Sequence, residues 1–114
     1  MVDITEQLDG DVLTLKIFGE VDASSSIYLD KAIQQALDNN HKKIMADLSG
    51  LEYISSAGLG VFMSYIEDFK NESVEFVIFG VSENVKNVFG ILGLDSLMTI
   101  CPSVEEAKQK LDGI

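Results

Sequence analysis

The spacing of hydrophobic and polar residues changes several times along the chain. Residues 12–18 largely alternate, which predicts a strand with one buried face, and residues 4–7 with the turn sequence LDGD indicate its hairpin partner. Residues 25–39 then repeat apolar positions at intervals of three and four, typical of a helix: Tyr28, Leu29, Ala32, Ile33, Ala36 and Leu37. The chain therefore opens with a hairpin followed by a helix.

The rest of the pattern alternates strands with helices. Short, mostly apolar runs predict three further strands at 43–47, 74–79 and 97–101. Helical spacing predicts helices at 57–70, 82–92 and from 102 onward, the last with a capping-box spacing at Ser103 and Glu106. In the 57–70 helix we expect Leu59, Phe62, Ile66 and Phe69 to pack against the sheet. The order predicts an α/β fold, a mixed sheet flanked by about four helices.

Length and composition favour one soluble domain over residues 1–114. A chain of 114 residues with 46% hydrophobic and 24% charged residues has the size and composition of one globular unit. No apolar run approaches the roughly 18 residues of a membrane span. The amino-terminal residues 1–11 contain neither a basic region nor a long apolar block, so no signal or transit peptide is visible. We therefore expect a cytoplasmic protein.

The charge balance narrows the choice of partners. A formal net charge of -11 at pH 7 repels nucleic acid and anionic membranes at long range. It favours a protein partner with a basic face. The alternative is that the acidity only supports solubility.

The segment LEYISSAGLGVF, residues 51–62, contains the most suggestive chemistry. Its pattern changes from strand to helix near Ser55 and Ser56, and a helix start has unpaired N–H groups that favour an anion. Ser56 is the predicted capping residue. The small residues Ala57, Gly58 and Gly60 let another molecule approach its hydroxyl. Local chemistry alone also fits a plain helix cap with glycines that serve close packing.

Enzymatic and metal-binding functions have little support in the sequence. His41 is the only histidine and Cys101 the only cysteine, and neither has the spacing of a metal ligand. Ser56 lacks a nucleophile elbow, and the glycines form neither a dinucleotide fingerprint nor a phosphate loop. The apolar surroundings of Cys101 predict a buried thiol. We expect no catalytic residue, no metal site and no cofactor.

Three segments together resemble the STAS domains of bacterial anti-sigma-factor antagonists, which are partner-switching regulators. They are GEVDA at 19–23, ADLSGLEYISSAGLGVF at 46–62 and VKNVFGILGLDSLMTI at 85–100, and the resemblance runs over nearly the whole chain. In that family, a kinase that is also the anti-sigma factor phosphorylates a serine one residue before a small-Gly-Leu sequence. By position this serine is Ser56. The family usually has an aspartate just before it, whereas this chain has Ser55.

The resemblance implies a function and a set of site residues. It implies an anti-sigma-factor antagonist that binds its anti-sigma factor serine kinase when unphosphorylated, while a metal-dependent serine phosphatase restores Ser56. The implied partner surface comprises Asp22, Ser55, Ser56, Ala57 and Gly58. Two alternatives stay open: a STAS interaction module without phosphorylation, and a receiver-like phosphoacceptor domain suggested by Asp47 at the end of a predicted strand.

Overall fold

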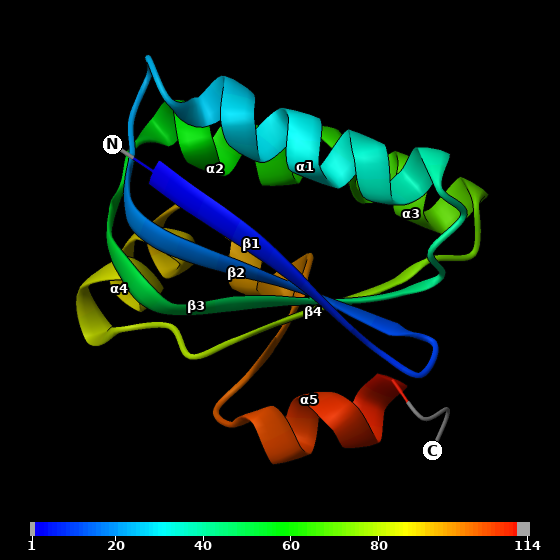
Figure 1. Cartoon of the computed structure of the whole chain (residues 1–114). Coiled ribbons are helices and arrows are strands. Elements are labelled where there is room, and N and C mark those ends of the chain that lie inside the picture. Colours follow the sequence, from blue (N-terminus) through cyan, green and yellow to red (C-terminus); the bar gives the residue numbers. More distant parts are fainter. Residues whose placement is uncertain (1, 112–114) are drawn as a thin grey trace.

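A five-stranded mixed sheet organises the chain, of which the computed structural model describes residues 2–111 (Figure 1). The strands lie side by side in sequence order: β1 (Val2–Asp9), β2 (Val12–Val21), β3 (Lys43–Ile54), β4 (Glu75–Phe79) and β5 (Thr99–Cys101). β1 runs antiparallel to β2, whereas β2 to β5 are parallel. The predicted hairpin and the predicted mixed α/β fold are confirmed.

Helices lie on both faces of the sheet. Their bounds are α1 (Ser26–Asp38), α2 (Ser56–Ser64), α3 (Ile66–Asn71), α4 (Glu83–Ile91), the 3-10 helix η1 (Leu94–Ser96) and α5 (Val104–Leu111). Figure 1 shows α1, α2 and α3 on one face and α5 on the other. Within residues 2–111, no helix has both the length and the apolar character needed to cross a bilayer.

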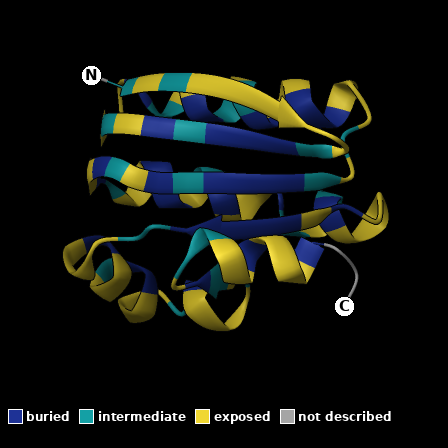
Figure 2. Cartoon of the chain, turned by 60° about the horizontal axis from the view of Figure 1, so that its bottom comes forward, coloured by how far each residue is buried: buried dark blue, intermediate teal, exposed yellow. Residues whose placement is uncertain are grey.

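The alternation of side chains along the strands divides the interior into two cores. Leu13, Leu15 and Ile17 of β2 face the larger core, which α1 to α4 complete. The smaller core lies under α5 and consists of Met45, Val77, Phe79, Cys101, Ala107 and Leu111. The predicted burial of Cys101 is confirmed. In Figure 2, α5 lies over the lower strands and leaves the outer face of β1 and β2 without a covering helix.

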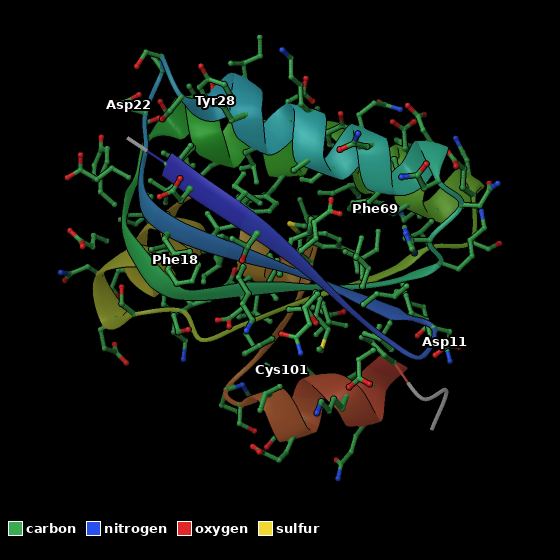
Figure 3. The ribbon with its side chains drawn as sticks, viewed as in Figure 1. Asp11, Phe18, Asp22, Tyr28, Phe69 and Cys101 are labelled. Carbon is green, nitrogen blue, oxygen red and sulfur yellow. The ribbon has the colours of Figure 1, made fainter. Side chains whose placement is uncertain are left out.

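Strand β3 is seven residues longer than the prediction that ended it at Asp47. It pairs with β4 only as far as Asp47 and then continues along β2 to Ile54, with two shifts of register. Gly50 makes this possible, because a Cβ there would lie 2.3 Å from Cδ1 of Phe18, its partner in the register (Figure 3). The extension brings Ser55 to the end of the sheet.

The predicted helix over 57–70 is two helices, because the helical hydrogen bonding is interrupted at Tyr65, between α2 and α3. The Tyr65 hydroxyl donates a hydrogen bond to the Asp30 carboxylate of α1, and its ring is buried. Leu59, Phe62 and Phe69 are buried as predicted. The prediction for Ile66 is wrong: Ile66 is only half-buried, since the break gives the buried position to Tyr65.

Capping explains the ends of two later helices. The Ser82 hydroxyl accepts a hydrogen bond from the backbone N–H of Val85, and the Ser103 hydroxyl accepts one from Glu106, at 3.3 Å in both cases. The second bond confirms the predicted cap of α5. The last strand begins at Thr99, two residues later than predicted, because η1 and the residue after it occupy the chain up to Leu97.

Candidate functional site

Two helix starts meet where β2 and β3 end. Val21 and Ile54 are register partners at the carboxyl ends of these parallel strands. The Ser55 N–H donates a hydrogen bond to the Val21 carbonyl oxygen over 2.8 Å, which holds the segments that follow β2 and β3 close together. Asp22 therefore precedes α1 and Ser55 precedes α2 at the same end of the sheet, as Figure 1 shows. The structure thus brings together sequence positions more than thirty residues apart.

Ser55, and not Ser56, caps α2. The Ser55 hydroxyl accepts a hydrogen bond from the Gly58 N–H over 3.3 Å, and its backbone is extended, with φ -84° and ψ 171°. The predicted cap at Ser56 is therefore wrong, because the helix begins one residue earlier than its apolar pattern. Ser56 is the first helical residue. It is exposed, and its hydroxyl makes no side-chain hydrogen bond with the described residues.

Asp22 organises the other helix start. Its Oδ1 accepts hydrogen bonds of 2.8–3.0 Å from the backbone N–H and hydroxyl groups of Ser24 and Ser25. These bonds, above all the one from the Ser24 hydroxyl, lower the pKa of the Asp22 carboxyl to about 2. Asp22 is therefore a fixed negative charge near neutral pH.

Gly58 has a packing role at the start of α2. It is buried, and a Cβ there would lie 2.7 Å from Cγ1 of both Val21 and Ile54. Ala57 and Gly60 are exposed, and a Cβ on Gly60 would meet nothing within 4 Å. The first turn of α2 thus presents Ser56 and Ala57 outward, while Gly58 lets the helix sit directly on the strand ends.

A comparison with protein families assigns the chain. The model of the STAS domain matches residues 3–107. The chain belongs to the STAS domain family. An anti-sigma-B factor antagonist from Listeria monocytogenes is 28% identical over 99 residues, which cover 87% of this STAS domain and 86% of that protein. The resemblance seen in the sequence is confirmed, and it is a resemblance to regulators, in line with the expectation of a non-enzymatic protein.

Solved structures share the same fold. An anti-sigma factor antagonist from Mycobacterium paratuberculosis superposes with a TM-score of 0.90 at 20% identity, covering 98% of this chain and 95% of that one. The Bacillus cell fate determinant SpoIIAA in its phosphorylated form gives 0.71 at 18% identity, covering 95% of this chain and 98% of that one. These matches confirm the fold of the STAS domain.

The receiver alternative is contradicted by the sheet. A receiver has a doubly wound parallel sheet in which the first strand is internal. In this STAS domain β1 is an antiparallel edge strand. Asp47 lies within β3, seven residues before its end, and its Oδ1 accepts a hydrogen bond from the Ser49 N–H. Among the described residues, no group of three or more His, Cys, Asp or Glu side chains could hold a metal ion.

The surface beside Ser56 includes apolar residues that the sequence did not single out. A groove between α1 and α2 is lined by Ser26, Ile27, Asp30, Ala57, Gly60, Val61 and Ser64. Ile27 is 51% exposed in this groove. Tyr28 is 58% exposed, although its spacing suggested an inward position, and it lines a separate groove beside β1 (Figure 3). Ile27 is a large apolar residue outside the buried face of α1. This position was the one sign in the sequence of a contact surface here.

Proposed function

We propose that this STAS domain is a cytoplasmic anti-sigma-factor antagonist that binds an anti-sigma factor serine kinase while Ser56 is unphosphorylated. One observation carries the proposal: Ser55 takes the capping role, which leaves the exposed Ser56 hydroxyl free for a partner. The names of the relatives support it, since the Listeria protein is an anti-sigma-B factor antagonist and SpoIIAA has both unphosphorylated and phosphorylated structures.

The proposed partner surface consists of Asp22, Ser55, Ser56, Ala57 and Gly58. Ser56 and Ala57 are its exposed part, and Gly58 acts from below by seating the helix. Asp22 contributes a fixed negative charge that a basic partner face would complement. The exposed Ile27 extends the surface along α1, in the groove that Ala57 and Gly60 also line.

The proposed switch adds a phosphoryl group to the Ser56 hydroxyl. Its Oγ would bond to the γ-phosphorus of the kinase's ATP, ADP would leave, and the hydroxyl proton would pass to a base of the kinase. The phosphate adds about -1.5 to -2 charges. By position, the N–H groups of Ser56 and Ala57 are among the unpaired first-turn donors and would stabilise it, so the fold should survive.

Phosphorylation should release the partner through repulsion and desolvation at the contact. A cost of about 3 kcal/mol corresponds to roughly a 100-fold loss of affinity. A metal-dependent serine phosphatase would then restore binding.

Incubation with the copurified kinase and ATP, followed by mass mapping, tests the assignment. We expect phosphate on Ser56 in the wild type and none on Ser56→Ala, which should still bind the kinase. Ser56→Asp should bind weakly. The matched control Ser55→Ala should still accept phosphate, although loss of the cap should lower its free energy of unfolding by about 1 kcal/mol.

Phosphate found on Ser55 alone would show that the wrong serine has been assigned. Binding of the kinase without any phosphorylation would favour the second candidate, a STAS interaction module that is not switched. That candidate draws support from Ser55, which puts an uncharged side chain where the family usually has aspartate.

A further inference from the structure

The outer edge of β1 is an open hydrogen-bonding surface. β1 is the first strand of the sheet, and no described strand pairs with its other side. Figure 2 shows this edge strand exposed over most of its length. The strand at the opposite edge, β5, has only three residues, whereas β1 has eight and its register with β2 is unbroken. A long and regular edge strand is a template for pairing with a further strand.

The register of the hairpin indicates which backbone groups of β1 are free. A two-residue turn at 10–11 closes the hairpin, so Asp9 and Val12 form the hydrogen-bonded pair beside the turn. Hydrogen-bonded and non-hydrogen-bonded pairs alternate along antiparallel strands. The N–H and C=O groups that point away from β2 therefore belong to alternate residues, namely Val2, Ile4, Glu6 and Leu8.

A groove of about 400 Å³ lies directly beside this edge, between β1 and α1. Its apolar lining comes from Val2, Ile4, Tyr28 and Ala32. Leu8 lies on the same face of β1 and is 61% exposed. A strand added to β1 would place every second side chain on this face, over the groove and beside Leu8.

The β1 side chains that face away from the groove favour a basic residue at two positions. Asp3 and Asp9 are exposed on that face, and β1 contains no lysine or arginine. Lys16 of β2 lies beside Thr5, between the two aspartates, so a positive charge is unfavourable at the middle of an added strand. The edge therefore favours a lysine or arginine beside each aspartate and uncharged residues between them.

Two further features restrict the strand that this edge can accept. Glu6 and Lys31 both line the groove, and because their opposite charges largely offset each other, apolar contact decides which side chains enter it. A second copy of the chain would bring its own three β1 acids to the edge, together with the same net charge of -11. Like charges side by side on paired strands are destabilising. The acids thus oppose pairing of two copies and favour a basic strand.

We propose that the β1 edge binds an extended segment of a partner protein as an additional strand. The segment alternates apolar side chains, which enter the groove over Ile4 and Tyr28, with polar ones, which are basic beside Asp3 and Asp9. Hydrogen bonds between the two backbones supply affinity, and the side chains supply specificity. α1 separates this groove from the one that Ile27 lines beside Ser56, so the inference does not rest on the proposed function.

A capped peptide of sequence Lys-Val-Thr-Val-Thr-Val-Lys tests the proposal. Because the sequence is palindromic, it can place lysine beside Asp3 and Asp9 and valine over the groove in either strand direction. The peptide is added to the isotopically labelled full chain, and amide hydrogen exchange is followed by NMR. At saturation, the amides of Ile4, Glu6 and Leu8 should exchange about tenfold more slowly. The intervening amides already bond to β2 and should change far less.

Two control peptides separate the contributions of charge and apolar contact. Replacing both lysines by glutamate keeps the apolar pattern and should weaken binding at least about tenfold, because each end then lies beside an aspartate. Replacing the three valines by serine keeps both lysines and should also weaken binding, because the groove is left unfilled.

Two pairs of variants test the edge and the groove. Glu6→Pro removes an outward N–H donor but no hydrogen bond to β2, and it should weaken binding of the lysine peptide about tenfold. Its control Glu6→Thr removes the same charge and keeps the N–H, so the change should be less than about threefold. Tyr28→Ala should weaken binding by removing a wall of the groove. Its control Tyr53→Ala changes an exposed tyrosine of β3 outside the groove and should have no effect.

Four results would overturn the proposal. They are equal affinity for the lysine and glutamate peptides, equal effects of the two Glu6 variants, no slowing of exchange in the wild type at about 1 mM lysine peptide, and slow exchange of the same amides without peptide that grows with protein concentration. The last result would show that two copies pair through β1. The wild-type measurements decide even if the proline variant fails to fold. None of these readouts depends on the kinase, so this inference and the proposed function fail independently.

Discussion

At the scale of single residues, two neighbouring serines divide the work at the start of α2. The Ser55 hydroxyl accepts the hydrogen bond from the Gly58 N–H and fixes the first turn. The hydroxyl of the adjacent Ser56 is therefore not needed to cap the helix. Asp22, at the other helix start, does have a structural role, because its Oδ1 accepts hydrogen bonds from the loop before α1. A phosphoacceptor should be replaceable without loss of the fold, and Ser56 meets that condition.

Asp22 should make the stability of the domain depend on acid. Its pKa is about 2 in the fold against 3.8 without the loop, so its contribution is complete above pH 4 and disappears as pH falls toward 2. The difference in free energy of unfolding between wild type and Asp22→Asn should therefore shrink over that interval. Urea denaturation at several pH values measures it. A difference that stayed constant over that interval would contradict this account of Asp22.

At the scale of elements, α2 is held by aromatic packing under the proposed site. Phe62 is fully buried, and its ring centre lies 6.0 Å from that of Phe76 and 6.1 Å from that of Phe89. Phe62→Ala should lower the free energy of unfolding by about 3 to 5 kcal/mol, a large share of a small domain's stability. Met63→Ala, next in sequence but exposed, should cost much less in the same chemical denaturation. Equal losses would contradict this packing.

Elements whose patterns are local could be predicted from the sequence. The hairpin, α1, β4 and α4 follow from alternation, helical spacing and glycine, and the structure changes their bounds by at most three residues. The second half of β3 could not be predicted in this way. Ser49 and Gly50 are poor strand residues in isolation. They become part of the strand because Gly50 pairs with Phe18 of β2 and leaves room for its ring, while Ser49 lies at the shift of register.

The candidate site was predicted in its residues but not in its detail. Asp22 and Ser56 came from motif resemblance, because residues so far apart in sequence gave no local sign that they share one end of the sheet. The cap was assigned to Ser56 instead of Ser55, since apolar spacing locates the body of a helix and leaves its first residue undetermined. The break at Tyr65 depends on a hydrogen bond to Asp30 of another helix, which no local pattern contains.

At the scale of the whole molecule, net charge should govern association with the proposed partner. A charge of -11 should attract a basic face at long range, so affinity should fall as salt rises from about 0.05 to about 0.5 M. Binding measured over that range tests this expectation. The stability of the domain alone, measured in the same buffers, is the control. An affinity that stays constant would show that steering by net charge is the wrong explanation.

The tight seat of Gly58 has a consequence for genetics. If the proposed kinase acts on this domain, a screen for variants that no longer respond to it should yield two phenotypes from neighbouring codons. Changes at Ser56 or Ala57 should leave normal amounts of a folded but unresponsive protein. Changes at Gly58 should lower abundance, because any side chain there collides with Val21 and Ile54 and forces the helix off the strand ends. Variants that lose the response would therefore suggest too large a contact surface for the proposed partner unless the amount of each protein were also measured.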